Sequence, residues 1–257
     1  MNKRCVVNVF TIGRENYAKG TERLVSSLYE SGYDGDLLVF SPDSVEEYKD
    51  KEVIVNEQLK GLATLHKALP FTDSLGVCRS HKEAPYQFKS FAIQHARELG
   101  YEQIVWMDSS IVIKRSLDTL FYLSNQIGVV LFDNPGCIEA VWTADDCLEL
   151  MGCSPKVANQ FFQIDAAVMF FDFTKKKAKE VFNDYLEVCL NPVALRGDSG
   201  SNRPEYSAHR HDQSILSYIA RIKNYVLPLN YGVWSYGYEL QRPDNDYNPT
   251  FCKVGIV

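Results

Sequence analysis

The chain has 257 residues and a formal charge of −6 at pH 7 with histidine neutral. Hydrophobic residues make up 46% of it and charged residues 23%, which is the composition of a globular protein and excludes an intrinsically disordered chain. The acidic balance argues against a general nucleic-acid binder, and no apolar run reaches the roughly 18 residues of a membrane-spanning helix.

Strand and helix patterns alternate along the first half of the chain. The apolar segment at 6–11 is short and β-branched and lacks a small-residue cleavage site, so it predicts a first strand rather than a signal peptide. A helix is predicted over 17–31, with Leu24, Val25 and Leu28 on one face and Gly32 at its end. The other elements predicted here are strands at 37–40, 53–55, 104–107 and 111–113, and a helix at 87–99.

The same alternation continues in the second half. Two buried strands are predicted at 127–132 and 166–171. Thr174 is the predicted N-cap of an amphipathic helix that reaches Cys189. A last helix begins at Asp212 and runs to about Arg221, and a strand at 225–227 follows it.

Strands separated by helices predict βαβ units and therefore an α/β fold with a mostly parallel sheet. In such sheets ligands bind beyond the carboxyl ends of the strands, which directs attention to residues 11–14, 108–110 and 133–134. The chain lacks the GxGxxG, GxxxxGK[ST] and GxSxG patterns, which argues against a dinucleotide-binding domain, a P-loop NTPase and an α/β-hydrolase.

The seven cysteines are odd in number and include no CxxC pair. This pattern is typical of reduced thiols and argues against both a disulfide framework and a zinc site. It predicts a cytoplasmic protein, with peripheral attachment to a membrane as a possible variant.

Several segments resemble GT-A nucleotide-sugar glycosyltransferases. LVSSLYESGY at 24–33 and LLVF at 37–40 resemble the nucleotide-binding start of these enzymes, and IVWMDSSIVI at 104–113 falls where they carry a DxD metal motif. Four further segments are similar to those of a branch that occurs in bacteria, viruses and animals: YQFKSFAI at 86–93, CLELMGC at 147–153, QIDAA at 163–167 and HRHDQSILSY at 209–218. The resemblance covers about residues 5–227.

This resemblance implies a single GT-A-like domain over 1–257, with a mixed, mostly parallel central sheet flanked by helices. The part at about 1–132 would bind the nucleotide, and the part at about 133–257 would bind the acceptor. The implied activity is the transfer of a sugar from a nucleoside diphosphate sugar, with UDP-sugars expected first, to a hydroxyl of a glycan or glycolipid in carbohydrate biosynthesis. No nucleic acid is expected as a partner.

Asp108 stands at the end of a buried strand, where a carboxylate can hold a divalent cation beside a diphosphate or simply cap the following turn. The resemblance makes Asp108 and Ser110 candidate ligands of Mn²⁺ or Mg²⁺. Because Ser110 replaces the second DxD carboxylate, we expect weak metal binding or none. Glycogenin-like families add a C-terminal histidine ligand, but no histidine follows Trp234.

The cluster at 209–213 places two imidazoles, a guanidinium and a carboxylate at a helix start. Asp212 suits the N-cap position, or it could bind sugar hydroxyls or act as a general base. His209 or His211 could bind the diphosphate or a metal, and Gln213 would join them in lining the sugar site.

Four other residues complete the predicted site. Asp165, in the position of an NAG segment of related transferases, is expected to contact the donor or acceptor sugar, or else to form only a strand-entry turn. Lys89 in the first turn of its helix favours a phosphate, and a solvated surface lysine is the alternative. Tyr17 could stack on the nucleobase or pack in the core, and Thr11 is placed beside the nucleotide.

Two other functions remain open from the sequence. The missing DxD carboxylate is compatible with a non-catalytic module that binds a nucleotide sugar or a glycan. A sugar-1-phosphate nucleotidyltransferase would share the architecture, but it usually opens with a Gly-rich loop bearing Arg and Lys, and Gly13-Arg14 is a weak match.

Overall fold

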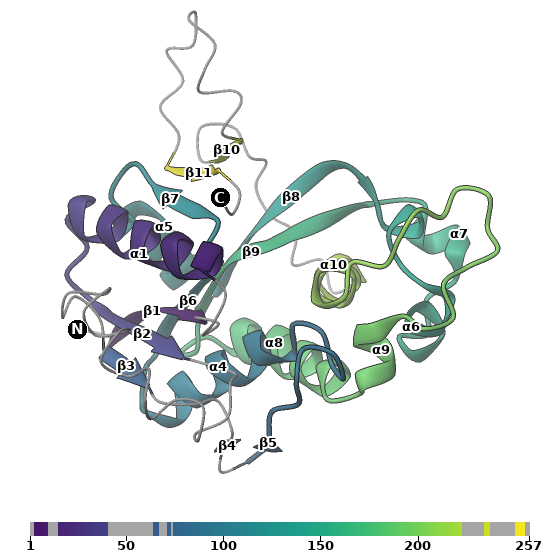
Figure 1. The fold of residues 1–257 in the computed structure, drawn as a ribbon, viewed down its shortest axis with the longest axis horizontal. Coiled ribbons are helices and arrows are strands. Elements are labelled where there is room, and N and C mark those ends of the chain that lie inside the picture. Colours follow the sequence, from purple (N-terminus) through teal and green to yellow (C-terminus); the bar gives the residue numbers. More distant parts are fainter. Residues whose placement is uncertain are drawn as a thin grey trace, which may run out of the picture.

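The computed structural model describes residues 3–9, 15–40, 64–66, 71–72, 74–222, 234–236 and 250–254. Thr11 and the strands predicted at 53–55 and 225–227 lie outside these residues. Within them the chain forms a layered α/β structure, from which an arm extends to a second group of helices (Figure 1).

The central sheet has the strand order β3-β2-β1-β6-β9-β8. Its first four strands are parallel to one another, whereas β9 pairs antiparallel with both β6 and β8. The prediction of a mixed, mostly parallel sheet is therefore confirmed. The strands are β1 (Arg4–Val9), β2 (Asp36–Phe40), β3 (Thr64–His66), β6 (Gln103–Met107), β8 (Val129–Ile138) and β9 (Phe162–Asp172).

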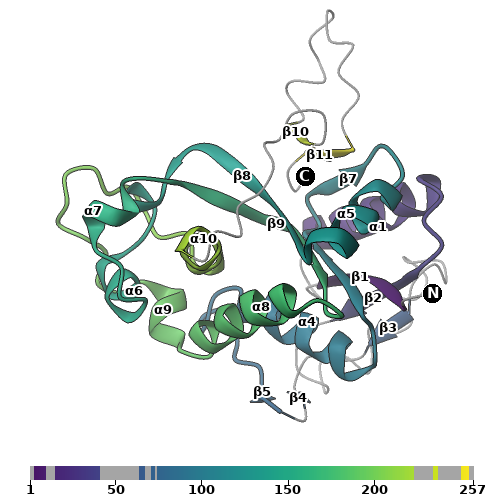
Figure 2. The same ribbon diagram turned by 180° about the vertical axis from the view of Figure 1, so that it is seen from behind.

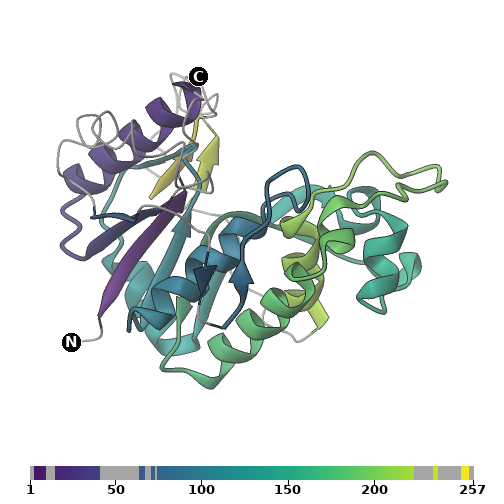
Figure 3. The ribbon, with the colours of Figure 1, turned by 60° about the horizontal axis from the view of Figure 1, so that its bottom comes forward.

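Helices cover both faces of this sheet. Alternate residues of β1 point to opposite sides, so Val6 packs with the apolar face of α1 while Val7 packs against α4. Figure 3 shows α4 and α8 lying side by side across one face. The helices are α1 (Glu15–Glu30) and α5 (Asp118–Ile127) on one face, and α4 (Gln87–Glu98) and α8 (Lys176–Cys189) on the other.

Strands β8 and β9 continue beyond the carboxyl end of β6 as a two-stranded arm. Met107, the last residue of β6, pairs with Val168, whereas Asp165 pairs only with Phe132 of β8. Figures 1 and 2 show this arm reaching the second group of helices, which we call the distal lobe. The lobe comprises the 3-10 helix η1 (Glu139–Val141) and the α-helices α6 (Asp145–Leu150), α7 (Pro155–Ala158), α9 (Pro192–Arg196) and α10 (Asp212–Ile222).

Two small sheets accompany the central one. In the first, β11 lies between β10 and β7 and pairs antiparallel with β7, the strand that follows Asp108. The second is the hairpin of β4 and β5. Their bounds are β7 (Ile111–Ile113), β10 (Trp234–Tyr236), β11 (Phe251–Lys253), β4 (Phe71–Thr72) and β5 (Gly76–Val77).

Several predicted boundaries were wrong. The strand predicted at 166–171 begins at Phe162, so Asp165 lies within β9 and not in a strand-entry turn. The apolar run at 127–132 is not one strand, because α5 extends to Ile127 and ends at Gly128, whose φ of 90° breaks the helix before β8 begins. Thr174 does not cap α8, since Lys175 precedes that helix. The Thr174 hydroxyl instead donates a hydrogen bond to Asp172 at 2.5 Å in the turn after β9.

No helix of the described ranges combines the length and the apolar character that crossing a membrane requires. Six cysteine side chains are described there, and each is a free thiol: Cys5, Cys78, Cys137, Cys147, Cys153 and Cys189.

Candidate functional site

A cavity of about 590 Å³ opens between the carboxyl edge of the sheet and the distal lobe. It brings together all the predicted site residues except Thr11, which is outside the described residues, and Tyr17, which is half-buried on α1. The lining residues are Tyr86, Lys89, Asp108, Ser110, Trp142, Asp165, Ala166, Ala167, Ala208, His209, Arg210, His211, Asp212, Gln213 and Lys253.

Lys89 lies at the inner end of the cavity and holds two carboxylates. Its Nζ is 3.1 Å from Asp108 Oδ1 and 3.2 Å from Asp212 Oδ2, and it donates a hydrogen bond to the Ala166 carbonyl at 3.1 Å. The Lys89 side chain is only 4% exposed, so the alternative of a solvated surface lysine is wrong. Because these three oxygens surround the ammonium group, a direct bond to phosphate would require Lys89 to give up one of these contacts.

Burial and the charges of this triad together set the pKa values of Lys89 and Asp212. Burial alone would lower the pKa of Lys89, but the adjacent Asp108 and Asp212 carboxylates outweigh it and raise that pKa. Burial raises the pKa of Asp212, Lys89 opposes the shift, and the nearby Asp108 adds to it. With all three groups ionised the triad carries a net charge of −1.

Asp212 is not the N-cap of α10 but its first helical residue. His211 precedes it with φ of 54°, the left-handed conformation, and this turn directs the Asp212 carboxylate toward Lys89. The N-cap interpretation of Asp212 therefore misplaces the cap by one residue, and the carboxylate is buried in the cavity wall at 3% exposure.

A buried polar network fixes the turn that carries Asp108 and Ser110. The Ser109 hydroxyl turns away from the cavity and lies 2.9 Å from Thr21 Oγ1 of α1, which donates to Asn8 Oδ1 at 3.1 Å. Asn8 Nδ2 donates in turn to the Met107 carbonyl at 2.6 Å. Sequence reasoning missed Asn8 and Thr21, although a polar residue inside the apolar run at 5–9 was a signal for such a network.

Asp165 forms a second ion pair in the lining of the cavity. It is 1% exposed, accepts a hydrogen bond from the Ala167 backbone N–H at 2.9 Å and pairs with Lys253 Nζ at 3.1 Å. Lys253 lies on β11, which the antiparallel pairing with β7 brings to the site. The sequence gives no local signal for this partner, since it stands 88 positions away.

The two histidines of the cluster at 209–213 differ in how many of their ring nitrogens are already hydrogen-bonded. His209 Nδ1 accepts from the Ala144 backbone N–H at 3.3 Å, so Nε2 carries the proton and donates to the Ala194 carbonyl at 2.9 Å. No ring nitrogen of His209 is left for a metal or a diphosphate, so we correct its role to a structural one. Burial, followed by the adjacent His211, lowers the pKa of His209 to about 4. His211 bonds the Leu195 carbonyl through Nδ1 at 2.7 Å and keeps Nε2 available.

The His209 ring packs directly on Gly197, and this contact yields a prediction. Gly197 has φ of 63°, and an added Cβ would lie 2.5 Å from the ring. Gly197→Ala should therefore destabilise the protein by clearly more than the roughly 1–2 kcal/mol that a left-handed alanine costs by itself. Gly152→Ala is the matched control, because Gly152 has φ of 67° with no atom within 4 Å of an added Cβ. Equal losses in urea denaturation would contradict the packing role of His209.

Behind the cavity, a chain of buried polar groups links Gln213 to Glu139. Gln213 Nε2 donates to Gln163 Oε1 at 2.7 Å, Gln163 Nε2 approaches Thr143 Oγ1 at 3.5 Å, and Thr143 donates to Glu139 Oε1 at 2.7 Å. Burial raises the pKa of Glu139 to about 8, with the hydrogen bonds from Thr143 and Gln163 and the charge of Arg221 opposing it. Glu139 therefore stays protonated in the folded protein at neutral pH.

This raised pKa predicts a pH-dependent stability. The folded pKa lies above the ordinary value of 4.5, so the stabilisation is present below pH 4.5 and is lost as the pH rises through 8. Between those limits Glu139 should lower the free energy of unfolding by about 1.4 kcal/mol per pH unit, and Glu139→Gln should remove that dependence. Urea denaturation at three pH values from 5.5 to 7.5 measures it, with exposed Glu149→Gln as control. Parallel pH curves for all three proteins would contradict the raised pKa.

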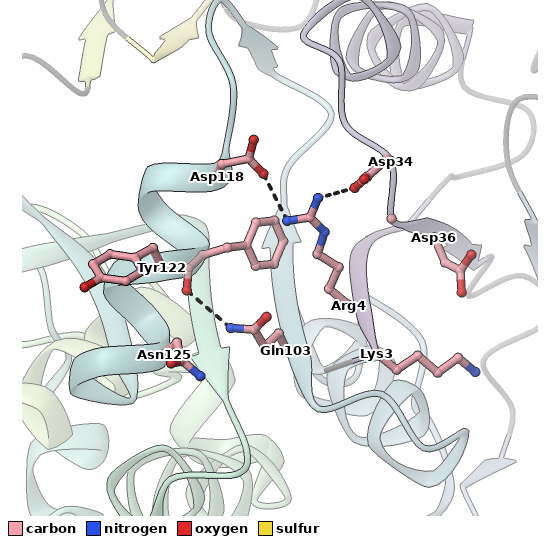
Figure 4. Close-up of a pocket in the computed structure, with 10 residues that line it drawn as sticks. Lys3, Arg4, Asp34, Asp36, Gln103, Asp118, Tyr122 and Asn125 are labelled. Atoms are coloured by element: carbon pink, nitrogen blue, oxygen red, sulfur yellow. Dashed lines mark hydrogen bonds and ion pairs between the residues drawn. The ribbon is translucent and has the colours of Figure 1, made fainter. Parts of the chain in front are cut away.

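A second cavity, of about 720 Å³, lies at the opposite edge of the sheet, where β1 and β6 begin (Figure 4). Arg4 there pairs with Asp34 and, at 3.0 Å, with Asp118. Both carboxylates are largely exposed, at 79% and 70%, and are already paired with one cation. Surface pairs of this kind are weak, and the strands' carboxyl ends point away from this cavity, so we do not place the functional site here.

Comparison with known proteins agrees with the architecture. No family model and no curated protein matches the sequence. The structure matches mouse xyloside xylosyltransferase 1 with a TM-score of 0.58 and 11% identity, over 97% of each chain. The galactosyltransferase LgtC, in complex with donor and acceptor sugar analogs, matches with 0.52 and 13% identity, over 97% of this chain and 86% of its own. The bifunctional glycosyltransferase WbbM matches with 0.57 and 14% identity over 99% of this chain, which spans 46% of the WbbM chain.

The chain has the GT-A fold. At identities of 11–14% the likeness extends to the fold and not to the chemistry of the site. What the cavity does has to be argued from its own residues.

Proposed function

We propose that this protein is a glycosyltransferase that moves a sugar from a nucleoside diphosphate sugar, with a UDP-sugar as the first candidate, to a hydroxyl of a carbohydrate or glycolipid acceptor. One observation carries the proposal: Lys89 joins Asp108 and Asp212 in a cavity at the carboxyl edge of a GT-A sheet. Ligands bind at this edge in open α/β sheets. The proposal assigns one GT-A-like domain to the chain and a cytoplasmic location.

Asp212 is the proposed general base for an inverting displacement. The acceptor oxygen forms a bond to the anomeric carbon while the bond from that carbon to the diphosphate oxygen breaks. The diphosphate leaves with the electron pair, and the hydroxyl proton passes to Asp212. Burial raises the pKa of Asp212, which makes its carboxylate a better proton acceptor than an exposed aspartate. Asp165, held by Lys253, is placed to accept hydrogen bonds from sugar hydroxyls.

A cation bound only by protein groups does not fit the cavity. Among the described residues, no three His, Cys, Asp or Glu side chains are grouped so that they could hold a metal. Asp108 Oδ1 already accepts a hydrogen bond from Trp106 Nε1 at 2.7 Å and pairs with Lys89. Asp108 Oδ2 and the Ser110 hydroxyl are the groups that would hold Mn²⁺ or Mg²⁺ if one were bound together with the donor. Such a cation would neutralise charge on the leaving diphosphate.

Hydrolysis or transfer of nucleotide sugars tests the proposed activity. A panel of UDP-, GDP-, CMP- and dTDP-sugars should contain at least one donor that the wild-type protein consumes. Asp108→Asn should abolish this turnover, whereas Asp198→Asn should retain it, because Asp198 is an exposed partner of Arg196 outside the cavity. Near-normal turnover in Asp108→Asn would contradict the assignment.

A second candidate function is a binding module without turnover. It is favoured by one observation, the hydroxyl of Ser110 in the cavity where the resemblance expects a carboxylate. The same panel separates the two functions, since a module would bind a nucleotide sugar and release no product. Pyrophosphate release from a nucleoside triphosphate in the presence of a sugar 1-phosphate would instead indicate a nucleotidyltransferase.

A further inference from the structure

Most basic groups that line the cavity are already engaged. Lys89 pairs with Asp108 and Asp212 and donates a hydrogen bond to the Ala166 carbonyl, as described above. Lys253 pairs with both oxygens of Asp165, at 3.1 and 3.3 Å. Both ring nitrogens of His209 are hydrogen-bonded to the backbone. A negatively charged ligand would therefore have to be met by another cation.

Arg210 is a basic lining residue whose charged group remains available, beside the imidazole of His211 with its Nε2. Its side chain is exposed, and its guanidinium lies over the Trp142 ring, 4.5 Å from the centroid. The Arg210 backbone N–H donates to the Trp142 carbonyl at 3.0 Å, which fixes the two residues side by side. In the described part of the chain, no hydrogen bond or ion pair uses the guanidinium. An arginine stacked in this way keeps its edge N–H groups free to bind a carboxylate or phosphate with two parallel hydrogen bonds.

Two groups of charged residues in and around the cavity carry net charges of opposite sign. Arg210, Asp165 and Lys253 lie near one another, because the charges of all three act on the Cys137 thiol, whose pKa is raised by burial. Those three charged groups sum to +1, whereas Lys89, Asp108 and Asp212 sum to −1. An anion without a bound cation is therefore favoured beside Arg210, whereas a diphosphate beside Asp108 and Asp212 would need the charge of Mn²⁺ or Mg²⁺.

We propose that Arg210 and Trp142 form a subsite for an acidic acceptor, a sugar that carries a carboxylate or phosphate group. The inference rests on the proposed function. Both residues belong to the distal lobe, since Trp142 directly follows η1 and Arg210 lies just before α10. Asp108, by contrast, directly follows β6 of the central sheet. The Trp142 face supplies apolar contact to the sugar ring, and the Arg210 edge binds its charged group.

Binding measurements on matched sugars test this subsite without requiring turnover. Calorimetry compares p-nitrophenyl glucuronide with the neutral p-nitrophenyl glucoside, and glucose 6-phosphate with glucose. We expect at least one acidic sugar to bind the wild-type protein about tenfold more tightly than its neutral counterpart, which is the effect of one charge-assisted contact. Arg210→Gln should abolish this preference. Lys156→Gln, which removes an exposed charge of α7 in the same lobe, should keep it.

Equal binding of acidic and neutral sugars by the wild-type protein, or a preference that survives Arg210→Gln, would overturn the inference. So would a tenfold loss of UDP affinity in Arg210→Gln, because the anion at Arg210 would then be the donor's diphosphate. If the wild-type protein binds no nucleotide sugar but keeps an Arg210-dependent preference for acidic sugars, the proposed function fails. The subsite then stands as that of a glycan-binding protein.

Discussion

Lys89→Met is expected to lower the free energy of unfolding by at least about 3 kcal/mol near neutral pH, because it leaves two carboxylates in the cavity wall without their shared cation. Lys89 Nζ lies within 3.2 Å of both Asp108 and Asp212, and the Asp212 side chain is 4% exposed. Removing one partner of a buried ion pair costs more than the pair contributes, since the remaining charge is desolvated and uncompensated. Urea denaturation of the purified variant measures the loss.

The pH dependence of this loss has a definite sign. Without Lys89 the folded-state pKa of Asp212 should rise further, so the variant's stability should be highest at low pH and fall as the pH rises through that pKa. The difference between wild type and Lys89→Met should therefore shrink on acidification toward pH 5. Adding Asp212→Asn to Lys89→Met should restore part of the stability. Lys176→Met, at an exposed pair with Glu180, should change it by less than about 1 kcal/mol.

A Lys89→Met protein as stable as the wild type at neutral pH would contradict the buried triad. A loss that is independent of pH and unaffected by Asp212→Asn would point to poor packing of the methionine instead.

Asp212→Asn is expected to lower sugar transfer at least about 100-fold while leaving the melting temperature within a few degrees of the wild type. The substitution keeps the shape of the side chain and removes the carboxylate that would accept the proton. It also leaves Lys89 and Asp108 as a neutral pair in place of a triad with net charge −1. We therefore expect no loss of stability from the charge change itself.

Turnover and melting temperature measured on the same preparation decide the role of Asp212. Asp198→Asn is the matched control, because it removes an aspartate carboxylate outside the cavity. Unchanged turnover would leave Asp212 as only a structural partner of Lys89. A large fall in both the melting temperature and the activity would likewise indicate that Asp212 has a structural role.

Local patterns in the sequence predicted much of the fold and the residues of the cavity. Apolar runs with intervening helices indicated the sheet, and ligand binding at carboxyl ends of strands directed attention to Asp108. The crowding of polar groups at 209–213 indicated a second wall. The structure places both in one cavity, although the chemical role of each residue stays a prediction.

The remaining features depend on contacts between segments far apart in the chain. The sequence favoured a phosphate contact for Lys89 and did not indicate its ion pair with Asp212, which is more than a hundred positions away. Lys253 reaches Asp165 only through β11. The structural role of His209 depends on the Ala194 carbonyl and the Ala144 amide. Because these are backbone groups, the pattern of side chains in the sequence does not indicate them. Helix α5 was not predicted, and the apolar run continues across Gly128, where only the backbone conformation separates helix from strand.

The most direct test of the account is a thermal-shift panel of UDP-, GDP-, CMP- and dTDP-sugars on the wild-type protein and on Asp108→Asn, with and without Mn²⁺. A donor present at about 100 times its Kd should stabilise the wild-type protein by about 2.7 kcal/mol. The account predicts such a shift for at least one nucleoside diphosphate sugar, and a much smaller shift for the same donor with Asp108→Asn. No shift with any nucleotide sugar, or equal shifts in the two proteins, would contradict a donor site at Asp108.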